Sequence, residues 1–337
     1  MAKIVILGAG GFGMALSAMA AENGHEVTLW SPFENEVTAL REQRGNPKLL
    51  PGIALPKQIE ITSSLEAAKS CDLAIIATPS FAVRETSRRL ADFLAPKALA
   101  ACVAKGFEEK TLKTLSQVME EELPGIAPVM ISGPSHAEEV AKSMATTVVA
   151  ASRARENAER IQDMLMNPSL RIYVNDDVTG VELGGALKNV IALAAGCVDG
   201  LKQGDNAKAA LMTRGITEIA RLGVAMGAKT ETFAGLSGIG DLIVTCTSMH
   251  SRNRRTGILI GSGLSVQEAI AQVGMTVEGY TSSKCAYELA KKMNVEMPII
   301  EQVYQVLYEG KDIRKAVSDL MGRPKRHESE VIWLLSK

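Results

Sequence analysis

Aromatic side chains are scarce in this 337-residue chain, and neither sign of charge prevails. Phe, Trp and Tyr make up 4% of the residues, which argues against stacking platforms for single-stranded nucleic acid. Lys plus Arg number 37 and Asp plus Glu 38, so the chain has no bulk basic excess for a nucleic-acid backbone or an anionic membrane. We therefore predict no nucleic-acid partner. Hydrophobic residues at 46% exclude a disordered chain, and the length predicts about two globular domains.

Paired cysteines and long apolar runs are also missing. The five cysteines include no C-x-x-C pair and are odd in number, which favours reduced thiols in a cytoplasmic protein; we predict no metal site. The apolar run Ile4–Leu7 is too short for the core of a signal peptide. A later run, Val190–Val198, falls well below the ~20 residues of a membrane span. We predict a soluble protein with no membrane span.

Short β-rich runs alternate with helical patterns in the first half of the chain. This alternation predicts a Rossmann-like, doubly wound α/β fold with a mainly parallel sheet. We expect its strands at Ile4–Leu7, Glu26–Trp30, Ile59–Thr62, Asp72–Ala77, Leu99–Val103, Pro128–Ile131, Thr147–Ala151 and Arg171–Val174. Helical patterns lie between them, among them Ser64–Lys69, Ala82–Leu94, Leu112–Glu121 and Arg155–Met166.

Beyond residue 178 the patterns are helical, apart from a loop at Ala234–Cys246 that contains the strand-like run Leu242–Thr245. We therefore predict a dinucleotide-binding domain at 1–178 and an all-α substrate domain at 179–337. The long helices expected at Val181–Leu201 and Ala207–Met226 are rich in small residues. Such helices suit a homodimer interface, but they pack equally well within a monomer.

A glycine-rich segment, Gly8-Ala9-Gly10-Gly11-Phe12-Gly13, follows the first predicted strand and opens the first helix. It fits G-x-G-x-x-G in the context that the motif requires. Gly8 permits a tight turn, Gly10 lets the backbone approach a pyrophosphate, and Gly13 allows close helix–strand packing. The helix N-terminus then offers free N–H groups to the phosphates. An ordinary glycine-rich turn is the alternative, but the position inside a βαβ unit favours a dinucleotide site.

The end of the second predicted strand is expected to contact the adenosine ribose. An acidic residue there favours NAD, but the chain reads Trp30-Ser31-Pro32-Phe33-Glu34. No acid closes the strand, and Glu34 lies beyond a proline. Ser31 can donate a hydrogen bond to a 2′-phosphate, although no Arg stands beside it. We expect NADP or NAD as the cofactor, with use of both and a slight lean to NADP.

Two polar segments follow predicted strands at the sheet edge where ligands of open α/β sheets bind. Lys105 in Val103-Ala104-Lys105-Gly106 can polarise a carbonyl or hold a phosphate; a solvated lysine is the alternative. Gly133 and Ser135 in Ser132-Gly133-Pro134-Ser135 can present polar groups to a ligand. A plain turn with Ser135 as a helix N-cap is equally compatible. We interpret His136 as structural.

Three further polar positions lie in the second half. Lys188 stands among small and apolar residues in a helix, where burial lowers a lysine pKa toward the range useful for proton transfer; a solvent-facing stripe is the alternative. Asp241 is a lone acid in a glycine-rich segment and can orient a lysine or cap a helix. Ser251, Arg252 and Asn253 open a helix and fit a phosphate site better than a nucleic-acid patch.

Taken together, these segments resemble the NAD(P)-dependent glycerol-3-phosphate dehydrogenases of the bacterial type. The ordered set also includes Leu187-Lys188-Asn189, Gly235–Leu242, Thr245-Cys246-Thr247-Ser248 and Val277-Glu278-Gly279. Each segment is weak alone, but the order is specific. The resemblance implies reversible reduction of dihydroxyacetone phosphate to sn-glycerol 3-phosphate, which feeds glycerophospholipid synthesis. The family commonly has Ser-Trp where this chain has Gly11-Phe12, and a basic residue near Ser31-Pro32.

The resemblance also implies roles for individual residues. Lys188 is the expected proton donor and acceptor, oriented by Asp241 and assisted by Lys105. Substrate contacts are expected from Lys105, Gly133, Ser135, Lys188, Asp241, Ser251, Arg252 and Asn253. The dinucleotide is expected to contact Gly8, Gly10, Gly11, Phe12, Gly13, Ser31, Lys105, Ala137, Arg252, Thr276, Val277 and Glu278. Two alternatives remain: a dehydrogenase of β-hydroxyacids, whose substrates are usually carboxylates, and a non-catalytic dinucleotide sensor.

Overall fold

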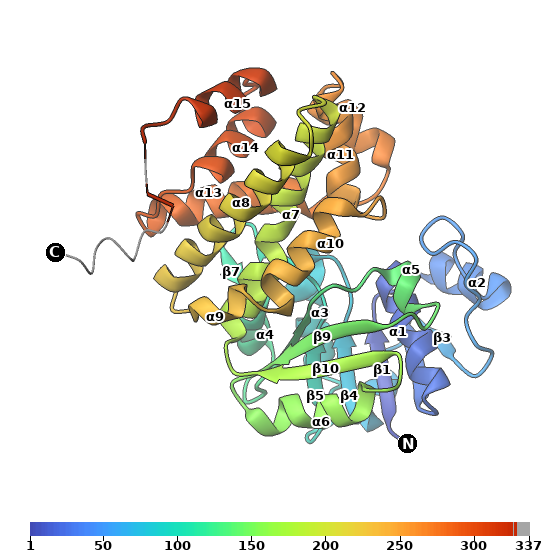
Figure 1. Cartoon of the computed structure of the whole chain (residues 1–337). Coiled ribbons are helices and arrows are strands. Elements are labelled where there is room, and N and C mark those ends of the chain that lie inside the picture. The colour runs from blue at the N-terminus through green and yellow to red at the C-terminus, as the bar shows by residue number, and fades with distance from the viewer. Residues whose placement is uncertain (326, 329–337) are drawn as a thin grey trace.

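The computed structural model describes residues 1–325, 327 and 328. The chain forms a sheet domain and a helical domain, which meet along one long helix, α7 (Figure 1). The predicted second domain extends to residue 337, so its last residues lie outside the described part.

The first domain is built on one eight-stranded sheet with the order β10-β9-β8-β5-β4-β1-β2-β3. All neighbouring strands are parallel except β8 and β9, which confirms the predicted mainly parallel α/β sheet. The strands are β1 (Lys3–Leu7), β2 (Glu26–Trp30), β3 (Glu60–Thr62), β4 (Leu73–Ile76), β5 (Leu99–Cys102), β8 (Val129–Ser132), β9 (Thr146–Ala151) and β10 (Leu170–Asn175). The chain leaves β1 toward β2 on one side and reaches β4 on the other, so the strand order reverses at β1. Ligands of such sheets bind at this reversal.

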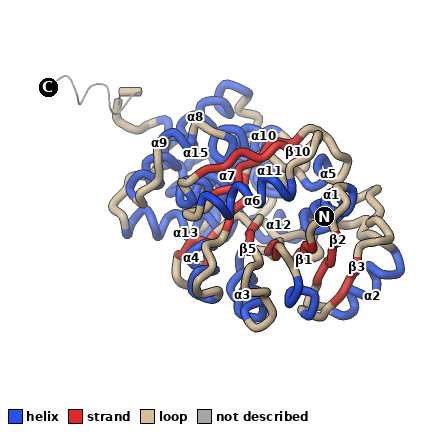
Figure 2. The backbone as a smooth tube through the Cα atoms, turned by 90° about the horizontal axis from the view of Figure 1, so that it is seen from below, coloured by secondary structure: helices blue, strands red, loops and turns tan. Residues whose placement is uncertain are grey.

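Helices cover both faces of the sheet, and the strand sequences show why (Figure 2). Ile4 and Ile6 pack on one face with α1, whereas Val5 and Leu7 pack on the other. A strand buried on both faces needs a continuous apolar run, as β1 has. The covering helices are α1 (Gly11–Glu22), α2 (Glu34–Gln43), α3 (Val83–Ala91), α4 (Leu115–Glu122), α5 (Ala137–Val140) and α6 (Arg155–Leu165), with short 3-10 turns at Glu66–Ser70 and Ser80–Ala82.

Every element from Val178 onward is helical in the described part of the chain. These helices are α7 (Val178–Gly200), α8 (Asp205–Ala225), α9 (Thr230–Phe233), a π-helical turn at Leu236–Gly240, α10 (Asp241–Thr247), α11 (Arg252–Gly261), α12 (Val266–Val273), α13 (Glu278–Lys292), α14 (Pro298–Tyr308) and α15 (Ile313–Met321). α7 runs through their centre with its neighbours packed around it (Figure 1). The structure therefore has the predicted order of an α/β sheet domain followed by helices.

Glycine allows α7 and α11 to cross at close range. A Cβ at Gly196 would lie 2.0 Å from the Arg254 carbonyl oxygen, and one at Gly257 would lie 2.0 Å from that of Leu193. The small residues of α7 thus pack against another helix of the same chain. Within the described residues α7 is the one helix long and apolar enough to cross a membrane, but 94% of its apolar window is buried in the protein. It has the burial of a core helix.

Two local predictions were wrong. The expected loop at Ala234–Cys246 with the strand-like run Leu242–Thr245 is the π-helical turn followed by α10. Its β-branched residues form a helix because one side of α10 packs against α7. The helix expected from Leu112 begins at Leu115, after a small hairpin of β6 (Phe107–Glu108) and β7 (Lys113–Thr114). Thr114 and Gln117 form a capping box there, which fixes the helix start.

Candidate functional site

The glycine turn lies between β1 and α1, where each glycine has a distinct role. Gly8 has a φ of +124°, and a Cβ there would lie 2.8 Å from the Ala77 carbonyl group. At Gly13 a Cβ would lie 1.9 Å from the Gly8 carbonyl oxygen, so only glycine lets α1 pack this close. A Cβ at Gly10, by contrast, would meet nothing within 4 Å. The backbone at Gly10 therefore faces open space beside the helix N-terminus, which fits a dinucleotide pyrophosphate.

Other residues predicted to contact the dinucleotide lie around this turn. Gly11 lies against Ala137, since its Cβ would come within 3.8 Å of the Ala137 Cβ, and Phe12 packs on the edge of the same core. Glu278, at the start of α13, accepts hydrogen bonds from the backbone N–H and the hydroxyl of Ser80 at 3.3 and 2.7 Å. Burial raises the pKa of Glu278, although these two bonds oppose the shift. Because Ser80 follows β4, this carboxylate links the helical domain to the sheet edge. Before it, Thr276 is exposed and Val277 is buried.

At the end of β2 the structure places an acidic side chain that the sequence did not point to. Ser31 is buried, and its hydroxyl donates a short hydrogen bond to the carboxylate of Glu36 on α2. No acid follows the strand directly in the sequence, but the fold brings the Glu36 carboxylate to the strand end. Sequence reasoning missed Glu36 because its carboxylate returns to the strand end from the first turn of the next helix.

Lys105, Asp241 and Lys188 come together in one buried cluster, which we call the lysine–aspartate cluster. Lys105 follows β5, Asp241 begins α10, and Lys188 lies in the middle of α7. Lys105 Nζ lies 2.7 Å from Asp241 Oδ2, and Lys188 Nζ contacts Asp241 Oδ1. The side chains of Asp241 and Lys188 are 1% and 8% exposed. The structure thus gives Asp241 two lysine partners and places Lys188 in the interior rather than on a solvent stripe.

Burial governs the ionisation of this cluster. It lowers the pKa of Lys188 to about 7, because the ammonium loses its hydration; the charge of Asp241 opposes this shift and that of Lys105 adds to it. Burial by itself would raise the pKa of Asp241, but the charges of Lys105 and Lys188 outweigh it and hold that pKa below its usual value. The cluster therefore combines a carboxylate whose pKa is held low with a lysine whose pKa lies near neutral pH.

Backbone and hydroxyl groups hold the two lysines in place. Lys105 Nζ donates to the Gly133 carbonyl oxygen at 2.9 Å, and the Ser135 hydroxyl donates to the same oxygen at 2.9 Å. Ser135 is therefore not the helix N-cap; His136 precedes α5. Lys188 Nζ also donates to the Thr245 hydroxyl at 2.8 Å. Sequence reasoning missed this role of Thr245, because it expected no helix that would bring residues 241 and 245 onto one face.

Ser251, Arg252 and Asn253 stand at the start of α11, as predicted, with different surroundings. The Ser251 hydroxyl caps the helix by accepting from Arg254 N at 3.2 Å. The buried Asn253 side chain bonds to neighbouring segments of the protein. Its Oδ1 accepts a hydrogen bond from Gly279 N at 2.8 Å, and its Nδ2 donates one to Asn189 Oδ1 at 2.9 Å. Arg252 is half-buried, and burial lowers its pKa. Among residues 1–325, 327 and 328 no hydrogen bond or ion pair holds its guanidinium, which leaves it available to an anion.

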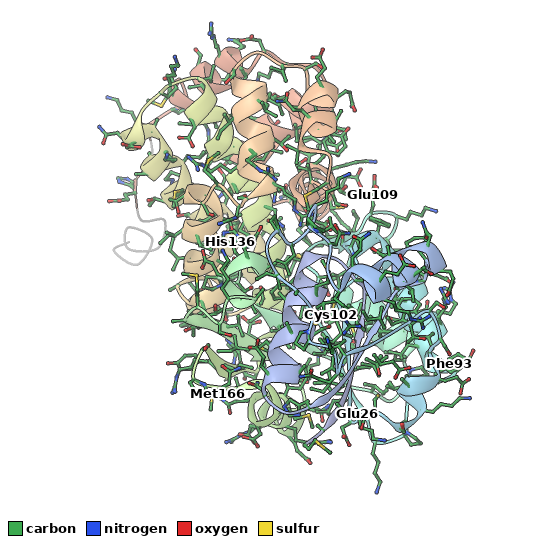
Figure 3. The ribbon with its side chains drawn as sticks, turned by 90° about the vertical axis from the view of Figure 1, so that its right-hand side faces the viewer. Glu26, Phe93, Cys102, Glu109, His136 and Met166 are labelled. Carbon is green, nitrogen blue, oxygen red and sulfur yellow. The ribbon has the colours of Figure 1, made fainter. Side chains whose placement is uncertain are left out.

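His136 lies where the two domains meet (Figure 3). Its Nε2 is buried and has no hydrogen-bond partner in the described part of the chain. Burial lowers the pKa of His136, and the charge of Lys188 lowers it further. The interpretation of His136 as structural stays a prediction, since a single histidine near a helix start carries no sequence signal of its own.

A Rossmann-like domain with an open phosphate turn, joined to a helical domain that supplies a buried lysine, defines a nicotinamide-dependent dehydrogenase. Comparison with known proteins specifies the family. The models of the NAD-dependent glycerol-3-phosphate dehydrogenase N-terminus and C-terminus match residues 3–158 and 177–318. The chain belongs to this family, and as an oxidoreductase it reduces dihydroxyacetone phosphate to glycerol 3-phosphate with NAD or NADP as the cofactor.

Individual relatives are similar to this chain over nearly its whole length. The chain is 50% identical to the glycerol-3-phosphate dehydrogenase [NAD(P)+] of Desulfitobacterium hafniense, over 100% of this chain and 96% of that protein. It is 54% identical to that of Moorella thermoacetica, over 97% and 98%. Among solved structures, the glycerol-3-phosphate dehydrogenase of Coxiella burnetii superposes with a TM-score of 0.92 at 38% identity, over 96% of this chain and 99% of that one. These likenesses argue against both the sensor and the β-hydroxyacid dehydrogenase.

Proposed function

We propose that Lys188 is the group that exchanges a proton with the C2 oxygen of the substrate, and that the reaction is reversible. The observation that carries this proposal is the buried lysine–aspartate cluster at the carboxyl edge of the sheet. The nicotinamide, when bound, supplies the hydride for C2. Negative charge then develops on the substrate oxygen, and the Lys188 ammonium stabilises it and delivers a proton. Asp241 orients Lys188, and Lys105 adds a second positive charge.

The substrate phosphate binds at the start of α11 and beside the sheet edge. Arg252 is the main anion partner, because its half-buried guanidinium has no ion pair among the described residues and a charge-assisted pair with phosphate is strong. Lys105, Gly133, Ser135, Ser251 and Asn253 complete the substrate site. Ser251 and Asn253 contribute chiefly by shaping the first turn of α11, since their side chains bond to the fold. Phosphate binding supplies the remote energy that orients the ketone.

The two domains have different roles in the reaction. Residues 1–178 hold the dinucleotide through the glycine turn, Ala137 and Lys105, while residues 179–337 supply Lys188, Asp241 and the phosphate site. Arg252, Thr276, Val277 and Glu278 reach the dinucleotide from the helical domain. The enzyme is cytoplasmic, and its product feeds glycerophospholipid synthesis. A homodimer would use surfaces other than the small-residue side of α7, which α11 covers.

One assay tests this function. NAD(P)H oxidation is followed with dihydroxyacetone phosphate, and in parallel with 3-oxo acids and 2-keto acids. We expect rapid oxidation with the phosphorylated ketone only. Preference for a carboxylate substrate would instead support a β-hydroxyacid dehydrogenase, and tight cofactor binding without oxidation of any substrate would support a sensor.

A further inference from the structure

The carboxylate of Glu36 lies at the position where the adenosine ribose of a dinucleotide is read. The Gly8 N–H donates to the Trp30 carbonyl at 2.9 Å, so the phosphate turn is joined directly to the end of β2. Ser31 continues the strand, since its N–H donates to the Thr62 carbonyl at 3.1 Å. Its hydroxyl then holds the Glu36 carboxylate at the strand end. A nucleotide whose pyrophosphate sits on the glycine turn therefore brings its ribose close to Glu36.

The basic residues of this segment are directed elsewhere. Arg41 Nε donates to the Ile61 carbonyl at 2.8 Å, and Arg44 NH2 to the Ile59 carbonyl at 3.0 Å. Both bonds tie α2 to the strand β3 region. Arg89, on α3, stacks over the Trp30 ring, with its Cζ 5.1 Å from the ring centroid.

Trp30 packs in the cluster on one face of the sheet, whereas its neighbour Leu29 packs on the other. Because side chains alternate along an extended strand, Ser31 belongs to the face of Leu29 and α1, opposite to Arg89. No ion pair involves Glu36 within the described ranges, so its charge is uncompensated by a protein cation. A 2′-phosphate at this point would meet the uncompensated carboxylate of Glu36.

We propose that Glu36 is a specificity-determining residue that makes this enzyme prefer NADH over NADPH. Its carboxylate accepts hydrogen bonds from the ribose hydroxyls of NADH, and it repels the 2′-phosphate of NADPH. Ser31 acts as the positioning residue that holds this carboxylate. The inference rests on the proposed dinucleotide site at the glycine turn, and it reverses the slight lean to NADP that the sequence alone suggested.

Direct binding tests this assignment apart from catalysis. Dissociation constants for NADH and NADPH are measured by nucleotide fluorescence on the full chain, for the wild type, Glu36→Gln and Glu34→Gln. We expect the wild type to bind NADH at least about tenfold more tightly, since like charges placed together at a binding site are costly. Glu36→Gln is expected to lose most of this ratio, with tighter NADPH binding and weaker NADH binding.

Glu34→Gln is the matched control, because Glu34 is an exposed acid in the same helix turn that bonds Ser63 instead. It should keep the wild-type ratio. Equal or tighter binding of NADPH by the wild type would overturn the inference, as would an unchanged ratio in Glu36→Gln at an unchanged melting temperature. If neither nucleotide binds the wild type, the dinucleotide site itself is wrong and the inference is overturned with it.

Discussion

Two clusters of charged side chains in this molecule use similar ion pairs in opposite surroundings. In the lysine–aspartate cluster, two lysines share one carboxylate that is 1% exposed. In the second, which we call the arginine–glutamate cluster, Arg84 on α3 lies 2.6 Å from Glu108, 2.7 Å from Glu121 and 2.6 Å from Glu122, and its side chain is 23% exposed. Both tie distant segments together, since Glu108 lies in β6 and the other two glutamates in α4.

The pKa shifts of the two clusters show what burial changes. Hydrogen bonds to the glutamates, that to Glu108 first, raise the pKa of Arg84, and Arg84 in turn lowers that of Glu108 to about 2. Both partners there are fixed in their charged forms. In the interior, loss of hydration outweighs the nearby aspartate and lowers the pKa of Lys188 to about 7. Only the buried cluster therefore contains a group that can exchange a proton near neutral pH.

The largest effect is expected on kcat, because only the lysine–aspartate cluster is proposed to take part in the reaction. We expect Lys188→Ala to lower kcat by at least about a hundredfold, the usual contribution of a positioned general acid. Steady-state turnover with dihydroxyacetone phosphate measures it. Lys229→Ala serves as the control, since Lys229 is an exposed lysine paired with Asp176. Near-normal turnover by Lys188→Ala would refute the proton-transfer role.

The sequence predicted the sheet and singled out Lys188 as a candidate because both are local features. Runs such as Ile4–Leu7 are apolar on both faces, as a covered parallel strand must be. Lys188 stands out because a charged residue within an apolar helix needs a cavity or a partner. Neither observation requires knowledge of a residue far away in the chain.

What the sequence did not predict depends on competing local patterns or on distant contacts. Leu242–Thr245 has the composition of a strand, and only packing against α7 makes it a helix, which hid the pairing of Thr245 with Lys188. Glu36 lies beyond a proline and reaches the end of β2 through its side chain. Asp241 meets lysines that come from the end of β5 and from α7. No spacing rule identifies them, so the expectation that Asp241 orients Lys188 came from the family resemblance alone.

The next effect concerns the pH dependence of the buried cluster. In the proposed mechanism reduction needs Lys188 protonated, so its kcat should fall as the pH rises through about 7. Oxidation of glycerol 3-phosphate should fall as the pH drops below that value. Asp241→Asn removes the charge that raises the Lys188 pKa, so we expect both limbs to move to lower pH. At pH 7 we expect kcat for reduction to fall about tenfold. pH–rate profiles in both directions check this; an unmoved limb in the variant would show that Asp241 does not tune Lys188.

A smaller effect is expected at Arg252, a half-buried cation that we propose binds the substrate instead of transferring a proton. Arg252→Ala should raise the KM for dihydroxyacetone phosphate by about tenfold or more and change kcat little, because it removes a charge-assisted contact to the phosphate. Arg255→Ala, at the second arginine after Arg252 on α11, is the control. An unchanged KM in Arg252→Ala would count against the phosphate site.

The smallest effect is expected in the arginine–glutamate cluster, and it should concern stability alone. Arg84→Met leaves three carboxylates without their shared cation, and we expect the free energy of unfolding at pH 7 to fall by on the order of 1 kcal/mol, with kcat unchanged.

The folded-state pKa of Glu108 lies near 2, below its ordinary value of 4.5, so its ion pair stabilises the protein fully above pH 4.5. That stabilisation is lost as the pH falls through about 2. Urea unfolding at several pH values should therefore show wild type and variant converging in acid. A stability difference that persists unchanged at low pH would mean that Arg84 acts through packing of its side chain, and a loss of kcat would mean that the two clusters are coupled.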